Sequence, residues 1–526
     1  NPAFNPTTGT YPYNPILGPN PLLILNEFQA PEDVTRFVGG LEAQFHPLSN
    51  LRIRYIAGVD DYRRQDRFLQ PPLSINASFT GSVQAPAQFS RQFNNDLLAN
   101  YEWSLSGIGM STGAGLRYTS NNLETLSASA QDLPPDQTLV GGATQFASQS
   151  LTELRTLGGY LEQRLSVNDR LYLTGGVNVD ASSAFGADQR WQFFPRVSLS
   201  WVMDEEPAFR GIFGGPLSSL RLRGAFGETG GQPPAAYSRF DNYVNASFAG
   251  RPGLVASTTI GNPDLKPERQ REYEVGFDAG VFKNRAQAEV TYYDKHTTDL
   301  VLSVPVALST GATQQLQNIG ELTNKGVEIA LNTVNIERHN FSWRSRLTWA
   351  ANRNKITKLA ASSDTLLFGY LNAVIVGQPV GVFYGGTYAR TADGKIAYAK
   401  VTADSLLLPV RGVDTLANGS RVNAQRIIGD PNPDFTASFS NSFDLPQGFQ
   451  FSFLLDGRFG SDVANFTRRI TEFFGSDASL ALEARGDTVP KTFGRNPAGR
   501  ISIYEEYVEN GSFVKVREVA LSKRFA

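Results

Sequence analysis

The sequence predicts an all-β chain: an antiparallel transmembrane β-barrel with short turns on one rim and long loops on the other. Three observations carry this prediction, namely segments with a two-residue period, short polar turns, and long connections between the hairpins. Residues 171–180 show the period, because Leu171, Leu173, Val177 and Val179 fall on one face and polar residues fall on the other. A sheet with one face in lipid must leave no open backbone edge, and closure into a barrel meets that condition.

Five polar turns each join two alternating segments into an expected hairpin. Tight turns of this kind select antiparallel neighbours. The expected pairs are residues 37–45 with 51–60, 160–166 with 171–180, 272–281 with 286–294, 326–336 with 341–350, and 436–445 with 449–458.

The connections between these hairpins are long. They cover residues 63–89, 121–151, 229–268, 297–325, 355–433 and 460–511. Loops of this length are usually functional. Short turns toward the periplasm and long loops toward the outside are the asymmetry of outer-membrane barrels. We expect about 15 strands, an odd number, whereas a closed bacterial barrel has an even number. Part of the barrel is therefore expected to lie outside these residues.

The composition suits a barrel in which one face of each strand and all the loops contact water. Hydrophobic residues make up 41% of 526 residues and the mean hydropathy is −0.25, values close to those of a soluble protein. No run of 18 apolar residues occurs, so no transmembrane helix is predicted. Aromatic residues reach 11%, which suits the aromatic belts of barrels. A soluble, aromatic-rich β-sandwich fits the composition equally well.

Charge and cysteine content exclude several partners and sites. The chain has 48 basic and 50 acidic residues without a basic run, so nucleic acid is not an expected partner. Cysteine is absent, which excludes disulfide scaffolds and thiolate metal sites. The first residues, Asn1 to Pro6, have the chemistry of a loop and not of a signal peptide, so a mature or truncated chain is expected.

Specific motifs resemble TonB-dependent outer-membrane transporters. Asn262-Pro263-Asp264-Leu265-Lys266-Pro267-Glu268, followed by Glu272-Tyr273-Glu274-Val275-Gly276-Phe277, resembles the family signature. Asn324-Lys325-Gly326-Val327-Glu328 is similar to a stretch of the SusC/RagA-type branch. Other matching segments are residues 180–186, 194–195, 220–223, 292–300, 317–321, 377–385, 429–435 and 511–517. The resemblance covers residues 150–526 well and residues 1–150 more weakly, and it departs at Lys523, where the family has an aromatic residue.

The resemblance implies an architecture. If the family barrel has 22 strands, this chain would supply about strands 6 to 20. Residues 1–526 would then be one barrel domain fragment, with residues 1–35 as the tail of an extracellular loop and residues 36–526 as barrel strands and loops. The family's plug domain, its TonB-contacting segment and its last strands are not found here.

The resemblance also implies a function. It implies TonB-dependent import of a large nutrient, an oligosaccharide or oligopeptide, across the outer membrane of a Gram-negative bacterium. The implied partners are a SusD-like surface lipoprotein, the TonB complex through the missing N-terminal region, the oligosaccharide or peptide substrate, and outer-membrane lipid. The alternative is a passive outer-membrane porin or a surface structural barrel.

No enzyme, cofactor or metal site is expected. Gly109-Met110-Ser111-Thr112-Gly113 has the form of a nucleophile elbow, but a strand-like segment follows where a helix is required, and we interpret it as a hairpin turn. The three histidines, His46, His296 and His339, do not cluster.

Two groups of residues are candidates for contact with ligand or plug. Aromatic rings in the loops suit stacking on sugars or peptide side chains, although they could equally pack the loops together. The candidates for substrate binding are Trp191, Tyr237, Phe240, Tyr243, Tyr370 and Phe474, with Arg239, Asp241 and Asn242 adjacent. Charged residues opposite the apolar face are expected to face the lumen, where they contact a plug or pair with each other: Glu272, Glu274, Glu289, Glu328, Arg344, Arg346, Asp456 and Arg458.

Overall fold

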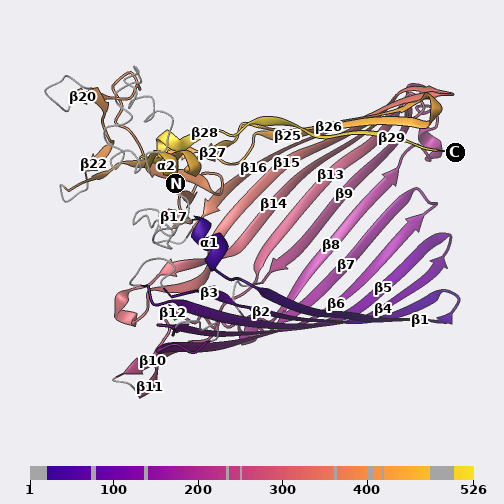
Figure 1. Ribbon diagram of the computed structural model, residues 1–526. Coiled ribbons are helices and arrows are strands. Elements are labelled where there is room, and N and C mark those ends of the chain that lie inside the picture. The colour runs from indigo at the N-terminus through magenta and orange to yellow at the C-terminus, as the bar shows by residue number, and fades with distance from the viewer. Residues whose placement is uncertain are drawn as a thin grey trace.

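The computed structural model describes residues 21–72, 79–134, 140–232, 236–248, 251–359, 364–400, 407–415, 420–473 and 503–525. Its main element is a 17-stranded sheet that curves into an open trough (Figure 1). Two of its strands are short, β3 (Phe68–Gln70) and β12 (Thr259–Ile260), which leaves fifteen long ones. The all-β prediction and the expected strand number are therefore confirmed.

The long strands pair with their neighbours in chain order, and every such pair is antiparallel. They are β1 (Glu32–Leu48), β2 (Leu51–Asp66), β4 (Ser82–Leu105), β5 (Ile108–Gln131), β6 (Thr144–Val167), β7 (Leu171–Ser182), β8 (Trp191–Val202), β9 (Leu217–Gly231), β13 (Glu268–Val281), β14 (Ala286–Pro305), β15 (Gln314–Arg338), β16 (Phe341–Lys358), β25 (Phe435–Leu445), β26 (Phe449–Phe459) and β29 (Phe513–Lys523).

Smaller elements lie at the long-loop rim. A four-stranded sheet consists of β17 (Thr365–Phe368), β18 (Asn372–Ile375), β19 (Val382–Gly386) and β24 (Gln425–Gly429). Two-stranded pairs are β10 (Tyr243–Phe248) with β11 (Arg251–Ala256), β20 (Tyr398–Lys400) with β21 (Leu407–Pro409), β22 (Val413–Thr415) with β23 (Arg421–Asn423), and β27 (Asp462–Ala464) with β28 (Val508–Asn510). The helical segments in the described residues are α1 (Pro21–Glu27), α2 (Phe466–Phe473) and the 3-10 turns η1 (Ala187–Gln189), η2 (Pro207–Phe209), η3 (Leu308–Thr310), η4 (Pro446–Gly448) and η5 (Tyr504–Tyr507).

All five predicted hairpins are present in the expected pairing. The turn between β6 and β7 shows why: Asn168 and Asp169 both have positive φ, 52° and 55°, and the Arg170 N–H donates to the Val167 carbonyl at 3.1 Å, as in the turns that favour hairpins. A sixth turn, between β4 and β5, was not predicted. It uses Ser106 and Gly107, again with positive φ. The predicted turn at residues 109–113 is wrong, because those residues lie inside β5.

Several predicted loops are largely strand. β5 and β6 each have 24 residues and β15 has 25, so much of residues 121–151 and 297–325 is paired sheet. A tilted strand crosses a bilayer in about 9–11 residues, so these strands continue well beyond the membrane. There both faces meet water and the alternation of apolar residues disappears. The sequence pattern therefore marked only the part of each strand that contacts lipid.

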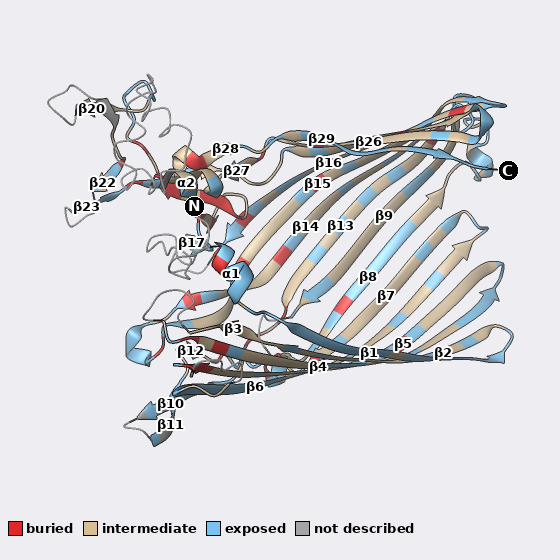
Figure 2. Ribbon diagram, in the orientation of Figure 1, coloured by how far each residue is buried: buried red, intermediate tan, exposed pale blue. Residues whose placement is uncertain are grey.

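The two faces of the long strands differ as the alternation predicts. In β13, Tyr273, Val275 and Phe277 are exposed on one face, while Glu272 and Glu274 lie on the other. Figure 2 shows the exposed and intermediate residues following one another along the strands. We assign the exposed apolar face to lipid. Among the described residues, no helix has both the length and the apolar character to span a bilayer.

Tryptophans mark the edges of the apolar face. Trp191 and Trp201 lie on the same face at opposite ends of β8, in register with the outward residues Ala181 and Leu171 of β7. At about 3.4 Å per residue they are roughly 34 Å apart along the strand, and a tilt near 40° reduces this to about 26 Å across the membrane. This matches the height of a barrel's apolar band between its aromatic girdles. Trp103 and Trp343 lie near the short-turn rim on the same face.

The face of Lys523 is settled by its register. Lys523 lies opposite Phe449, on the same side as Leu521 and Phe451, and its ammonium is 4.8 Å from the centre of the Phe449 ring. Its outward position at the short-turn rim allows the charged group to reach the interface while the stem covers apolar surface.

The sheet has two edges in the part of the chain that the structure describes. β1 pairs only with β2 and β29 only with β26. Because fifteen consecutive long strands alternate in direction, β1 and β29 run the same way. They cannot pair with each other as antiparallel neighbours, and antiparallel closure of the sheet requires an odd number of further strands.

Candidate functional site

The connection after β9 forms a tight turn that presents aromatic rings at the long-loop rim. The Tyr237 hydroxyl oxygen accepts a hydrogen bond from the backbone N–H of Glu153 in β6 at 2.9 Å. The Phe240 N–H donates to the Tyr237 carbonyl at 3.0 Å and closes the turn. The Asn242 side-chain amide donates to the carbonyls of Tyr237 and Phe240 at 3.3 and 3.1 Å. The two predicted rings are thus held in fixed positions.

A second segment, just before β13, supports this turn from behind. The Gly261 N–H donates to the Asp241 carboxylate at 3.0 Å, and the Asn262 N–H donates to the Ser238 carbonyl at 3.0 Å. The Gly261 carbonyl in turn accepts from the Gln315 side chain at 2.8 Å. A Cβ at position 261 would collide with the Phe240 backbone, so only glycine fits.

These segments enclose a cavity of about 680 Å³, which we call the loop cavity. Rings alternate with hydroxyl and amide groups around it, and its lining contains no charged side chain. This mixture suits a polar oligomer that stacks on rings and accepts or donates hydrogen bonds. The lining residues are Thr152, Ala236, Tyr237, Ser238, Phe240, Asn242, Thr259, Ile260, Ser303, Gln314 and Leu316.

The other predicted binding residues do not join the loop cavity. Trp191 is 57% exposed on the outward face of β8, so it belongs to the membrane girdle and not to a ligand site. Tyr243 opens the β10–β11 hairpin and is 65% exposed without lining the cavity. Phe474 lies outside the described residues.

Tyr370 belongs to a separate aromatic cluster. Its ring centre lies 5.4 Å from that of Phe466 and 6.1 Å from that of Tyr504, both edge-on. The Arg469 guanidinium lies over Tyr370 and Tyr504 at 5.7 and 5.0 Å. Burial raises the pKa of the Tyr504 hydroxyl. These contacts pack three loop segments together, yet Tyr370 keeps 67% of its surface exposed.

Inside the trough, three of the predicted lumenal charges form ion pairs with residues outside the predicted set. Lys295 pairs with Glu272 at 3.0 Å, Arg517 with Asp456 at 2.8 Å, and Arg344 with Asp444 at 3.2 Å. Arg458 donates to the Pro431 carbonyl. Such wet pairs contribute little individually, about 0–1 kcal/mol.

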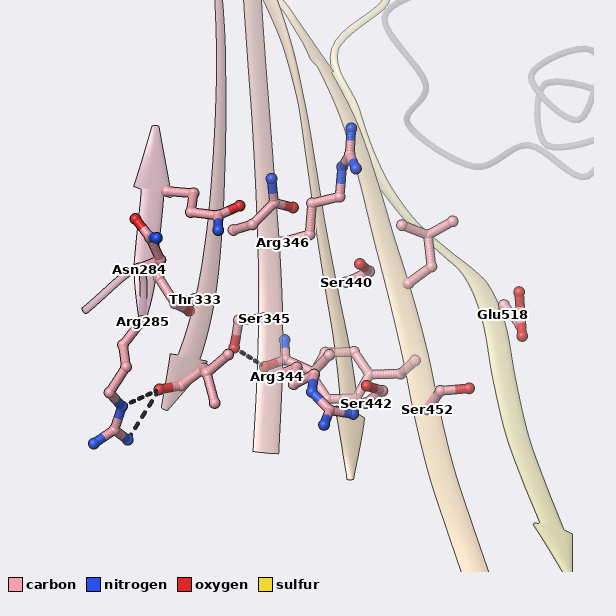
Figure 3. A pocket seen from close by; sticks show the side chains of 16 residues that line it. Asn284, Arg285, Thr333, Arg344, Ser345, Arg346, Ser440, Ser442, Ser452 and Glu518 are labelled. Carbon is pink, nitrogen blue, oxygen red and sulfur yellow. Dashed lines mark hydrogen bonds between the residues drawn. The ribbon is translucent and has the colours of Figure 1, made fainter. Parts of the chain in front are cut away.

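Three of the predicted lumenal charges form no ion pair among the described residues: Glu289, Glu328 and Arg346. Glu274 forms no close ion pair either, but Lys295 and Arg223 attract it. Arg346 lines a cavity of about 380 Å³ near the short-turn rim. Figure 3 shows Arg344 and Arg346 on β16 beside serines of β25 and β26, with Glu518 on the far strand. The wall therefore presents unpaired charges of both signs toward the lumen.

The signature segment, residues 262–268, lies next to the loop cavity and is held by a cluster of hydrogen bonds. Leu265 is fully buried, and its carbonyl accepts from the Gly186 N–H at 3.2 Å. Asn318 accepts from the Lys266 N–H at 3.1 Å and donates to the carbonyls of Lys266 and Asp299 at 2.8 Å each. Lys266 also pairs with Asp299 at 2.9 Å. The motif thereby fixes the outer ends of β14 and β15.

The elbow-like motif lacks the surroundings of a nucleophile. The Ser111 hydroxyl donates to the Asn100 side chain at 2.8 Å across two paired strands. Within the described ranges, no group of three or more His, Cys, Asp or Glu side chains is placed to hold a metal ion.

We expect Ser111→Ala to leave function unchanged, because Ser111 contributes one wet hydrogen bond worth about 1 kcal/mol. A fluorophosphonate probe, which labels activated serines, is expected to label neither the natural protein nor the variant. Labelling that depends on Ser111 would contradict this prediction.

Sequence reasoning found the rings of the loop cavity but missed most of its polar lining. Thr152 comes from β6, whereas Ser303 and Gln314 come from β14 and β15, which lie much later in the sequence. No motif connects them, because the long connection after β9 brings them together only by folding across to Glu153 of β6.

Comparisons with known proteins agree with this architecture. Residues 1–407 match a family model described as "TonB dependent receptor-like, beta-barrel". TonB-dependent receptor P26 of Formosa agariphila is 26% identical over 529 residues, which cover 92% of this chain and 52% of the relative. TonB-dependent receptor SusC of Bacteroides thetaiotaomicron is 23% identical, covering 99% of this chain and 54% of SusC. The chain therefore spans about half the length of the curated relatives it matches.

Solved structures show the same fold. The structure of the RagAB peptide transporter matches with a TM-score of 0.78 and 22% sequence identity, over 95% of this chain and 56% of the matched chain. The RagAB peptide importer in its "open-open" state also gives a TM-score of 0.78, at 21% identity.

Proposed function

Because this chain belongs to the TonB-dependent receptor-like β-barrel family, we propose that it forms the wall and external loops of a transporter that imports a large nutrient. The chain is a SusC/RagA-like receptor barrel of the Gram-negative outer membrane, and the receptors of this family are transporters and not enzymes. The substrate we propose is an oligosaccharide or an oligopeptide. RagAB is described as a peptide transporter, which supports the second class.

The loop cavity is the observation that carries this proposal. Two aromatic rings and several hydroxyl and amide groups line a space of about 680 Å³ at the rim that faces outward. A passive pore needs no such lining, whereas a receptor must hold its ligand before uptake. Tyr237 and Phe240 would stack on the ligand, and Asn242 and Gln314 would bond its hydroxyl or peptide groups.

The lumenal wall supports a plug as a second part of the proposal. Glu289 and Glu328 form no ion pair with a described residue, and neither does Arg346. We propose that residues 36–526 act as one barrel unit and that a plug, supplied by the complete protein, contacts these charges. A SusD-like surface lipoprotein would close over the long loops, and the TonB complex would act through the plug.

Uptake is expected to need TonB. Cells that carry the complete receptor as their only route for an oligosaccharide or peptide are expected to lose growth on it when tonB is deleted. Growth that survives the deletion would favour the alternative, a passive porin or a surface structural barrel.

The rings of the loop cavity are expected to set affinity. Replacing both Tyr237 and Phe240 with alanine in the complete receptor is expected to weaken ligand binding at least ten-fold, because burial of one aromatic side chain contributes about 1.5–3 kcal/mol. Calorimetry with the growth-supporting oligomer measures this. Tyr243→Ala is the matched control, since Tyr243 is exposed outside the cavity. Equal affinities in all three proteins would contradict the assignment of the site.

A further inference from the structure

The outward face of four neighbouring strands, β13 to β16, changes from uncharged to charged along a common boundary (Figure 1). Residues directly opposite each other on adjacent strands form rows across the sheet, and their side chains lie on the same face. Four successive outward rows contain no charged residue: Val275, Tyr292, Val327 and Ala351; Phe277, Val290, Ile329 and Trp349; Ala279, Ala288, Leu331 and Leu347; and Val281, Ala286, Thr333 and Ser345.

The next two outward rows toward the long loops are rich in cations. They are Tyr273, Asp294, Lys325 and Arg353, and then Arg271, His296, Thr323 and Lys355. We call the four basic residues Arg271, Lys325, Arg353 and Lys355 the outer cationic belt. The belt lies only on the long-loop side of the uncharged rows, which is the side of the outer leaflet.

The carboxylates that pair with the belt lie deeper than its cations. The Glu228 side chain is 7% exposed and accepts from Arg271 at 2.8 Å, whereas 52% of the Arg271 side chain is exposed. Asp294 likewise is less exposed than Lys325, with which it pairs at 2.9 Å. The positive groups therefore form the outer layer of this part of the face.

The charges of the belt are only partly neutralised. Arg353 pairs with Asp434 at 2.7 Å, and Glu228 is shared between Arg271 and Arg269. Lys355 is exposed and forms no ion pair with any residue that the structure describes. Among the belt and its ion-pair partners, basic side chains therefore outnumber carboxylates, and the face keeps an excess of positive charge.

We propose that the outer cationic belt binds the phosphate groups of lipids in the outer leaflet. The acyl chains lie against the uncharged rows, and the phosphate oxygens accept hydrogen bonds from Lys325, Arg353 and Lys355. Basic residues at a membrane edge attract anionic headgroups, and guanidinium donors match phosphate geometry in pairs. The inference goes beyond transport, because it gives the outer wall of the barrel a preferred lipid.

Continuity with the apolar face favours lipid over a protein as the occupant of the belt. Lys325 and Arg353 lie only two residues beyond Val327 and Ala351 on the same face. A molecule that covers both rows must therefore combine an apolar part with an anionic part at a fixed distance, as a phosphorylated lipid does. Tyr273 lies at the boundary, where amphipathic rings meet headgroups.

Two lipids that differ only in the phosphate test the chemistry. Native mass spectrometry of the complete receptor, titrated with dioleoyl phosphatidate or with dioleoylglycerol, measures how many lipids are retained and how tightly. The natural receptor is expected to bind the phosphatidate at least ten-fold more tightly, because each basic residue near an anionic surface contributes about five-fold.

Two double variants of β16 assign the preference to one face. Arg353→Gln with Lys355→Gln is expected to weaken phosphatidate binding at least ten-fold and to leave dioleoylglycerol binding unchanged. Arg344→Gln with Arg346→Gln removes two charges from the lumenal face of the same strand and is expected to bind both lipids as the natural protein does. Arg353→Lys with Lys355→Arg keeps both outward charges, so the preference is expected to persist.

Three results would overturn the inference. One is equal binding of the two lipids by the natural receptor. Another is a preference that persists in the Arg353 and Lys355 glutamine variant when its heat-modifiable mobility is normal. The third is loss of a second protein subunit from that variant with lipid binding unchanged, which would assign the belt to a protein contact.

A variant of β15 keeps the test decisive if the double glutamine variant fails to assemble. Lys325→Gln removes one outward charge and is expected to weaken phosphatidate binding about five-fold. An unchanged affinity in assembled Lys325→Gln would contradict the inference as directly as the result on β16.

Discussion

Replacing Val275 with arginine is expected to keep the protein from assembling in the outer membrane. Val275 is 58% exposed near the middle of β13, on the face that we assign to lipid. Arginine at the bilayer midplane of a barrel costs about 2–4 kcal/mol, a large part of a typical folding free energy. The amount of receptor in the outer-membrane fraction, and its heat-modifiable mobility on gels, measure assembly.

The matched control places the same charge on the opposite face. Ala330 of β15 lies opposite Glu289 and two positions from Glu328, on the lumenal side. Ala330→Arg is expected to assemble normally, because an arginine there meets carboxylates that lack counter-ions. Equal loss in both variants, or equal assembly of both, would contradict the assignment of the two faces.

Asn318→Ala is expected to loosen the outer ends of β14 and β15 and to abolish ligand binding. The substitution removes three hydrogen bonds and leaves the Lys266 N–H and two carbonyls without partners. Each buried polar group left unsatisfied costs about 1–3 kcal/mol. Ile260 and Leu316, which line the loop cavity, lie next to these hydrogen bonds in the sequence. The cavity is therefore expected to lose its shape when the bonds are lost.

Hydrogen–deuterium exchange resolves this effect by segment. Faster exchange is expected at residues 259–268 and 314–320, whereas the parts of the same strands near the short-turn rim are expected to exchange as in the natural protein. Gln317→Ala is the control, because the Gln317 side chain donates one hydrogen bond among the described residues, to the Gln315 side chain at 2.8 Å. Unchanged exchange in Asn318→Ala would show that the signature segment does not hold these strands.

The membrane-spanning part of the fold could be predicted from the sequence because two local rules fix it. Polar turns set the register of each hairpin, and the two-residue period sets the face of every side chain. The same rule could have placed Trp191, which shares its parity with Val197 and Leu199 on β8. Its position in this alternation, and not its place next to a loop, decides which face of the sheet it occupies.

The rest depended on contacts that no local rule encodes. The strands beyond the membrane have no lipid to impose an apolar face, so the sequence pattern predicts β5, β6 and β15 shorter than they are. The loop cavity brings the turn around Tyr237 next to β6, β14 and β15, and the bond from the Glu153 N–H to the Tyr237 hydroxyl connects the turn to β6. The loop rings were predictable as a class, but the choice of Tyr237 and Phe240 over Tyr243 was not.

The shared direction of β1 and β29 limits the ways in which this sheet can close. If the fifteen long strands closed into a tube by themselves, β1 and β29 would lie side by side and run in the same direction. Their backbone donors and acceptors could not form an antiparallel ladder. The fifteen long strands alone therefore cannot close as an antiparallel barrel, and the outer edges of β1 and β29 keep backbone groups that can pair with further strands.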